Sequence, residues 1–197
     1  MWLVLLGCHG AGKTSLGKAL ARHLGWVFHE EIGRLMAEDP RWRARNLTAA
    51  SSQQAFDDEL FRREVFRDRE WPLHRPRIIE TWHPGNLAYA KARGSLVPSD
   101  QLASIQLQCR SAPVWVLPVV APREVLAARQ SEPGALEFFL SVAGRSLLQA
   151  ERLGLAVLPP VWTHHDPPDH LASRLVPRLL EMDGEERVLA SMEGVPR

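Results

Sequence analysis

The residues with the most specific chemistry lie close to the amino terminus. Residues 7–14 read GCHGAGKT, which has the spacing G-x-x-x-x-G-K-[ST]. Glycines in such a loop let backbone N–H groups turn inward around a β-phosphate, and the lysine adds a positive charge for the β- and γ-phosphates. The threonine hydroxyl is placed to bind Mg²⁺. The pattern therefore predicts ATP and Mg²⁺ as ligands, bound by Gly7, His9, Gly10, Ala11, Gly12, Lys13, Thr14 and Ser15.

Such a loop works only between a buried strand and the start of a helix. Residues 2–6 form a continuous apolar run, and residues 13–24 keep helical spacing up to Gly25. Similar apolar runs recur at residues 26–28, 77–80, 114–120 and 156–162, separated by segments long enough for crossover helices. This alternation predicts an α/β fold with three layers, in which a five-stranded parallel sheet carries helices on both faces.

Composition narrows the class of partner. The 24 basic and 23 acidic residues nearly cancel, so no overall field would hold the chain on nucleic acid or on an anionic membrane. No apolar run approaches the roughly 18 residues that a membrane span needs. The 2 cysteines are too few for a disulfide framework. We therefore expect a cytoplasmic monomer or homodimer whose partner is a small molecule.

With its glycine-rich motif and this order of elements, the chain resembles the nucleoside and nucleotide kinases of the P-loop superfamily over about residues 1–180. These include deoxynucleoside kinases, thymidylate kinase-like proteins and the ATPase/kinase domain associated with NAD metabolism. The resemblance implies that an acid after the second strand faces the acceptor hydroxyl, and Glu30 and Glu31 are both candidates, with Glu31 slightly favoured. It also implies a Mg²⁺-binding or acceptor-binding role for Glu80 and a charge-neutralising role in the lid for Arg129.

The same resemblance divides the chain into parts. We expect a kinase core at residues 1–182 and a polar tail at residues 183–197. Within the core, an insert at residues 39–72 would bind the acceptor, and residues 123–145 would form a lid that also contains Arg123 and Arg145. The loop at residues 163–166 would border the adenine site. Its adjacent histidines lack the further ligands that a metal site requires.

Several polar and aromatic residues are candidates for reading the acceptor. Trp82 would stack on a flat base, His83 and Asn86 would hydrogen-bond to it, and the Gln54 amide would pair with a base edge. The alternatives are a packed loop in which Asn86 caps the next helix, and a solvated helix start at Gln54. The insert also contains Arg41, Arg43 and Arg45, which would bind the phosphate of a nucleotide acceptor.

These residues together predict an ATP-dependent kinase of a nucleoside or nucleotide. No N-K-x-D stretch for guanine recognition is found in the sequence, and residues 114–120 do not end in the acidic pair of large ATPase machines. Glu80 is followed by Thr-Trp rather than by the arginine of deoxynucleoside kinases, so that narrower assignment does not carry over. A kinase of a non-nucleotide metabolite or antibiotic, and a nucleotide-dependent switch or accessory ATPase, remain the alternatives.

Overall fold

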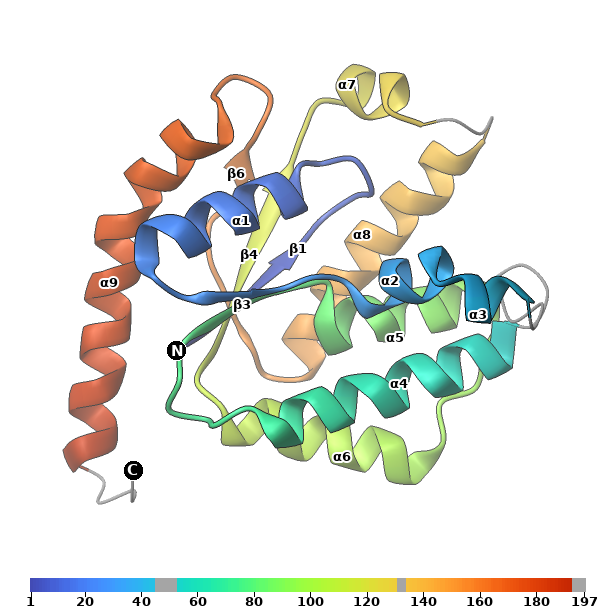
Figure 1. Cartoon of the computed structure of the whole chain (residues 1–197), viewed down its shortest axis with the longest axis horizontal. Coiled ribbons are helices and arrows are strands. Elements are labelled where there is room, and N and C mark those ends of the chain that lie inside the picture. Colours follow the sequence, from blue (N-terminus) through green and yellow to red (C-terminus); the bar gives the residue numbers. More distant parts are fainter. Residues whose placement is uncertain (45–52, 131–133, 193–197) are drawn as a thin grey trace.

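The computed structural model describes residues 1–44, 53–130 and 134–192. Its centre is a parallel sheet in the order β2 (Val27–His29), β3 (Arg77–Glu80), β1 (Trp2–Leu6), β4 (Val114–Val120) and β5 (Ala156–Val157), with β6 (Val161–Trp162) beside the end of β4 (Figure 1). All of these strand pairs are parallel. The predicted parallel sheet of an α/β fold is confirmed.

The last predicted strand differs from the expectation. Residues 156–162 form two short strands, of which β5 pairs with the start of β4 and β6 with its end. Pro159 and Pro160 lie between them, and proline has no N–H to donate to a neighbouring strand. The segment therefore stays beside β4 without forming one continuous ladder.

One face of the sheet is covered by α1 (Lys13–Leu24) and α9 (Pro168–Met192), as Figure 1 shows. Leu16 and Leu20 of α1 pack with Leu171 and Leu179 of α9 in one core cluster. The predicted tail at residues 183–197 begins inside α9, which continues to Met192. Asp183 is buried and pairs with the amino group of Met1 at 2.9 Å, so this residue belongs to the core. Residues 193–197 lie outside the described residues.

The other face is covered by four helices, which lie together on the opposite side of the sheet in Figure 1. They are α4 (Gln53–Glu70), α5 (Trp82–Arg93), α6 (Ser99–Ser111) and α8 (Ala135–Arg152). A second core cluster joins Val4 and Ile79 of the sheet with Phe61, Ala90 and Ile105 of these helices. The two clusters and the sheet between them make the three predicted layers.

Two helices lie between β2 and α4, and the second of them belongs to the insert. They are α2 (Ile32–Glu38) and the short α3 (Pro40–Ala44), for which the sequence analysis predicted no helix. Met36 and Trp42 of these helices pack against Phe56 and Leu60 of α4, which explains why the Pro- and Arg-rich stretch folds. Among the described helices, none is both long enough and apolar enough to cross a membrane.

Candidate active site

The glycine loop, residues 7–14, joins β1 to α1 in a conformation that requires its glycines. Gly10 and Gly12 have φ values of +80° and +91°, a region that other residues avoid. At Gly7, an added Cβ would lie 2.1 Å from the carbonyl oxygen of Val119, so β4 leaves no room for a side chain. The loop therefore has the shape that the motif predicts.

Neighbouring segments hold this loop by its carbonyl groups. Arg129 Nη1 donates to the oxygen of Gly10 at 2.6 Å, and Gln130 Nε2 donates to the oxygen of His9 at 3.1 Å. From the other side, Thr163 Oγ1 donates to the oxygen of Ala11 at 2.6 Å. The roles of Gln130 and Thr163 were not predicted, because nothing in the sequence relates residues that lie more than 100 positions apart.

Lys13 lies at the base of the loop and is only 6% exposed. Its Nζ donates to the carbonyl oxygens of Gly7 and Cys8, at 3.1 Å each. The amino-terminal end of α1 points its partial positive charge at the same place. Lysine and helix together make a site for an anion such as a phosphate chain.

The Thr14 hydroxyl meets the carboxylate of Glu80. Thr14 Oγ1 donates to Glu80 Oε1 at 2.9 Å and to Oε2 at 3.0 Å. Glu80 ends β3 directly beside Leu5 of β1, and its burial raises the pKa of the carboxyl group. Hydroxyl and carboxylate oxygens are the hard ligands that suit Mg²⁺, so these two residues fit that ion. Within the described residues no three His, Cys, Asp or Glu side chains cluster as metal ligands.

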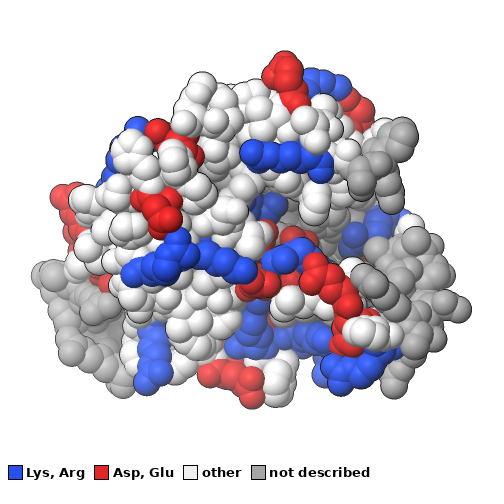
Figure 2. All heavy atoms as spheres, turned by 45° about the horizontal axis from the view of Figure 1, so that its top comes forward, with Lys and Arg blue, Asp and Glu red and all other residues white. Residues whose placement is uncertain are grey.

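The structure distinguishes the two neighbouring acids after β2. Glu30 pairs with Lys18 at 2.6 Å and with Arg34 at 3.0 Å, and the Lys18 hydrogen bond lowers the pKa of Glu30. The charge of Glu31, which precedes α2, instead favours higher pKa values for His9, Glu80 and Tyr89, although burial has the larger influence on each of these pKa values. Glu31 is therefore the acid that lies toward the glycine loop. Figure 2 shows acidic and basic side chains gathered around a hollow in the upper face of the molecule.

Trp82 and His83 do not lie where the sequence analysis placed them. Both side chains are 0% exposed, and both hydrogen-bond to Asp68 of α4. The predicted loop at residues 82–86 is in fact the first part of α5, where Pro84 is tolerated. Neither side chain can contact an acceptor from this buried position.

The amides of Asn86 and Gln54 are also used within the protein. Asn86 is buried inside α5, where its Nδ2 donates to Glu64 at 3.1 Å, so it neither caps a helix nor faces a ligand. Gln54 Nε2 donates to the carbonyl oxygen of Leu96 at 2.8 Å, and Gln54 Oε1 accepts from the N–H of Leu96 at 2.8 Å. This pair ties the start of α4 to the segment after α5. These two base-reading predictions therefore do not match the geometry.

The turn before α5 has an uncommon backbone. Thr81 and Trp82 have positive φ values of 70° and 49° without being glycines. Each such residue costs on the order of 1–3 kcal/mol, and they occur where the surrounding structure enforces them. The turn follows directly after Glu80, so the strained residues are the immediate neighbours of the residue that meets Thr14.

An unpredicted row of aromatic rings runs from the glycine loop to α5. His9 stacks on Phe139 with ring centroids 4.9 Å apart, Phe139 contacts Phe138 at 5.5 Å, and Phe138 contacts Tyr89 at 6.2 Å. Phe138 is 38% exposed. The charge of Glu31 contributes to the pKa values of both His9 and Tyr89, so this row of rings lies near the acid that faces the loop.

The predicted lid and phosphate-binding arginines lie in different places. Arg129, which follows α7 (Arg123–Ala128), contacts the glycine loop as described above. Arg123 pairs with Glu137, and Arg145 lies on α8, where it lines the same cavity as Lys91. Arg41 pairs with Asp39 at 2.9 Å. The side chain of Arg43, all of Arg45, and residues 131–133 of the predicted lid turn lie outside what the structure describes.

A cavity of about 310 Å³ adjoins the glycine loop. Its lining includes Gly12 and Ser15 together with Arg129, Thr163 and Asp166. The predicted loop at residues 163–166 therefore does border a space next to the phosphate-binding residues. Cys8 of the loop is buried, and burial raises the pKa of its thiol, so the helix does not activate it as a nucleophile.

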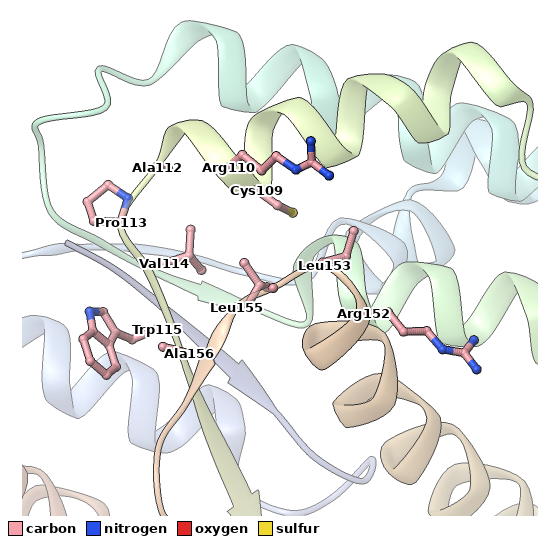
Figure 3. A pocket seen from close by; sticks show the side chains of 11 residues that line it. Cys109, Arg110, Ala112, Pro113, Val114, Trp115, Arg152, Leu153, Leu155 and Ala156 are labelled. Atoms are coloured by element: carbon pink, nitrogen blue, oxygen red, sulfur yellow. The ribbon is translucent and has the colours of Figure 1, made fainter.

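A larger cavity lies at the amino end of the same strands. It measures about 430 Å³ and lies between the end of α6, the start of β4 and the end of α8 (Figure 3). Cys109, Val114, Leu153 and Leu155 line it, and no carboxylate does. In parallel α/β sheets ligands bind at the carboxyl ends of strands, so the glycine loop marks the candidate site rather than this cavity.

Comparison with known proteins agrees with this geometry. The model of a family described as an AAA domain matches residues 2–138. The YorR protein of Bacillus subtilis, in complex with phosphorylated GDP, is 18% identical with a TM-score of 0.58, covering 94% of this chain and 98% of that one. No curated protein matches the sequence.

Two further solved structures share the fold at low sequence identity. Deoxyadenosine kinase from M. mycoides with dCMP and dCDP is 11% identical with a TM-score of 0.61, covering 92% of this chain and 100% of that one. Shikimate kinase from Aquifex aeolicus is 14% identical with a TM-score of 0.51, covering 94% and 98%. The fold is that of P-loop kinases.

Proposed function

Since the chain belongs to the AAA-domain family and has the fold of P-loop kinases, we propose that it is an ATP-dependent kinase. It transfers the γ-phosphate of ATP to a small-molecule acceptor, a nucleoside or a nucleotide. The observation that carries the proposal is the contact between Thr14 and Glu80 beside Lys13. Through this contact the phosphate-binding lysine, the two proposed Mg²⁺ ligands and the neighbouring acid Glu31 lie together at one edge of the sheet.

ATP binding follows from the residues around the glycine loop. Backbone N–H groups of residues 7–15 and the Lys13 ammonium would bind the phosphates, while Thr14 and Glu80 would hold Mg²⁺. When bound, this ion neutralises charge on the phosphate oxygens. The base occupies the cavity of about 310 Å³ beside Gly12 and Thr163, a volume within the range of ligand pockets, about 300–1,000 Å³.

Transfer requires an acceptor hydroxyl directed at the γ-phosphorus. Glu31 orients this hydroxyl and accepts its proton as the new O–P bond forms. The bond between the γ-phosphorus and the bridging oxygen breaks, and ADP leaves. Lys13 and Arg129 neutralise the negative charge that develops during the exchange. Positioning and charge neutralisation supply most of the rate increase in such reactions.

The acceptor's ring lies against the aromatic row formed by His9, Phe139, Phe138 and Tyr89. This row takes the place of the Trp82 stacking that the sequence suggested, because Trp82 is buried. A partly exposed ring such as Phe138 offers a flat surface on which a nucleobase stacks. The similar fold of a deoxyadenosine kinase supports this choice of acceptor class.

A panel assay tests the proposal. Purified protein is mixed with ATP and Mg²⁺ and with nucleosides, nucleoside monophosphates, sugars or aminoglycosides, and ADP release is measured together with phosphorylation of the acceptor by mass spectrometry. We expect one nucleoside or nucleotide to be phosphorylated by the native protein and not by Lys13→Ala. Failure of every acceptor to raise ADP release would contradict the kinase proposal.

Two observations favour other functions enough to include them in the panel. Shikimate kinase has the same fold, so a non-nucleotide metabolite or an antibiotic is the second candidate acceptor. The AAA-domain description also fits a nucleotide-dependent switch or accessory ATPase. Phosphorylation of a sugar or aminoglycoside would identify the first, and slow ATP hydrolysis without any acceptor product would identify the second.

A further inference from the structure

Glu80 is held between two segments that share one buried partner. Asp68 of α4 accepts a hydrogen bond from Arg77 Nη2, three residues before Glu80. It also accepts from Trp82 Nε1 at 2.9 Å and from His83 Nε2 at 2.8 Å, just after Glu80. One carboxylate on a separate helix thus binds both sides of the strand end that carries Glu80.

The strained turn after Glu80 needs contacts that maintain its backbone conformation. Thr81 and Trp82 have positive φ values, and the carbonyl oxygen of Leu5 accepts the N–H of Thr81 at 3.0 Å. An added Cβ at Gly85 would lie 2.3 Å from Thr81 Cγ2, so the turn is also tightly packed. Backbone in sparsely populated conformations relaxes unless surrounding contacts enforce it. The hydrogen bonds of Asp68 to the first two residues of α5 are such contacts.

The surroundings of Asp68 are suited to an ionised carboxylate that is buried among hydrogen-bond donors. Asp68, Arg77, Trp82 and His83 are all between 0 and 2% exposed. Trp82 packs edge-on against Trp2, with ring centroids 6.0 Å apart, and the Arg77 guanidinium lies 3.5 Å from the Trp2 ring centroid. Although burial works in the opposite direction, the hydrogen bond with His83 and the nearby charge of Arg77 keep the pKa of Asp68 below its ordinary value. Asp68 therefore stays ionised among its three donors.

We propose that Asp68 is a positioning residue that sets the Glu80 carboxylate against Thr14 by clamping Arg77 on one side and Trp82 and His83 on the other. The inference rests on the proposed function, because Glu80 is taken there as a Mg²⁺ ligand. Asp68 itself touches neither the metal nor the nucleotide. Its effect reaches them only through the position of Glu80.

The test compares two buried carboxylates of the same helix. Asp57 is also about 1% exposed and also accepts three hydrogen bonds, two from Arg93 and one from Ser95. These partners lie at the carboxyl end of α5, whereas Glu80 precedes its amino end. Asp68→Asn and the matched control Asp57→Asn are titrated by calorimetry with the non-hydrolysable analogue AMP-PNP, once with Mn²⁺ and once with EDTA. The ratio of the two affinities reports metal coordination and is not moved by a general loss of stability.

We expect Asp68→Asn to weaken Mn²⁺-AMP-PNP binding by about 10-fold to 100-fold, the usual cost of losing a residue that orients a metal ligand. Binding of metal-free AMP-PNP should stay unchanged, and Asp57→Asn should keep the native ratio. In a Glu80→Gln background, Asp68→Asn should add no further loss. If Asp68→Asn does not fold, Trp82→Phe, which removes one donor and keeps the ring, should give a smaller loss in the same direction.

Two results would overturn the inference in distinguishable ways. Equal metal dependence in Asp68→Asn and Asp57→Asn, with a native protein that binds Mn²⁺-AMP-PNP, would remove the positioning role and leave the proposed function intact. A native protein that binds AMP-PNP equally with Mn²⁺ and with EDTA would remove Glu80 as a metal ligand, and the positioning role with it.

Discussion

The glycine loop and the interface between α4 and α5 hold functional groups in place by opposite means. The loop is held through its backbone, because Arg129, Gln130 and Thr163 donate to its carbonyl oxygens. The interface is held through side chains. Asp57, Glu64 and Asp68 of α4 are buried, and each pairs with polar groups of α5 or its neighbouring segments.

This difference separates two ways of losing activity. The chemistry of the glycine loop resides in adjacent residues, so a substitution there removes a charge or a ligand directly. The buried carboxylates of α4 do not belong to the glycine loop, so they can affect the site only through the residues that they hold in place. Arg67 of the same helix also reaches the site's neighbourhood, because it donates to the carbonyl oxygen of Glu30 at 3.0 Å. Substitutions in this interface should shift the acids Glu31 and Glu80 rather than remove them.

The largest expected effect is on the loop side. Lys13→Ala should lower the rate of phosphate transfer by about 100- to 1,000-fold, the cost typical of removing one charge-stabilising group from an active site. Lys18→Ala is the matched control, because Lys18 lies on the same helix and is half exposed. Its rate should stay within about twofold of the native rate, as expected for a surface ion pair. Coupled ADP release measures both, and equal rates for Lys13→Ala and Lys18→Ala would contradict the role of the loop.

The neighbouring acids Glu30 and Glu31 allow a catalytic acid to be compared with a structural one at adjacent positions. Glu31→Gln should lower the transfer rate by about 100-fold, because it removes the group that accepts the proton. Glu30→Gln should leave the rate almost unchanged, since Glu30 is engaged with Lys18 and Arg34 on the partly exposed side. Single-turnover measurements of the phosphorylated acceptor distinguish the two. A larger loss in Glu30→Gln would reverse the assignment.

What the sequence predicted correctly is largely local. The helix at residues 13–24 is confirmed to the residue, because the phosphate-binding motif and Gly25 mark both of its ends. Glu80 ends β3, as the apolar run at residues 77–80 predicted, and its role at the ligand-binding edge of the sheet stays a prediction. The strand order and the packing of α9 against α1 depend on contacts between distant residues, so no local pattern predicts them.

The polar α4–α5 interface was missed although its sequence contains a signal. Asp57, Glu64 and Asp68 lie on the same helical face as the buried Phe61, at spacings of four, three and seven residues from it. Charged residues on the apolar face of a helix are expected to have buried partners. Once α4 is assigned such partners, Trp82 and His83 become candidates for the interface instead of the acceptor site.

A pH dependence of stability should arise from His29 of β2, which lies near Arg67 of α4 and Arg77 of β3. Burial lowers the pKa of His29 from 6.5 to about 4, and the nearby charges of Arg67 and Arg77 act in the same direction. The unfolded chain therefore binds an additional proton between about pH 4 and pH 6.5, so the free energy of unfolding rises with pH across this window. At about 1.4 kcal/mol per pKa unit, and reduced for the solvent screening of this half-buried side chain, the contribution of His29 is on the order of 2 kcal/mol.

Chemical denaturation at several pH values measures this contribution. The difference between the native protein and His29→Asn isolates the residue from other titrating groups, such as Glu80, whose raised pKa acts in the opposite direction. The variant should show a shallower rise between pH 4 and 6.5. An unchanged slope would mean that His29 is protonated in the folded protein.

The smallest expected effect decides which aromatic residues contact the acceptor. Phe138→Leu should raise the KM of an aromatic acceptor by about tenfold, which corresponds to roughly 1.4 kcal/mol of lost stacking and burial. The KM of ATP should stay constant, because Phe138 is in the row beside Tyr89 and not in the cavity beside Thr163.

Trp82→Phe should leave the acceptor KM unchanged, since Trp82 is fully buried and hydrogen-bonded to Asp68. Its expected effect is a loss of about 1–2 kcal/mol in the free energy of unfolding, because one oxygen of the buried Asp68 loses a hydrogen-bond donor. If instead Trp82→Phe raises the acceptor KM while Phe138→Leu does not, the acceptor would have to reach the α4–α5 interface, and the distinction between the two regions would fail.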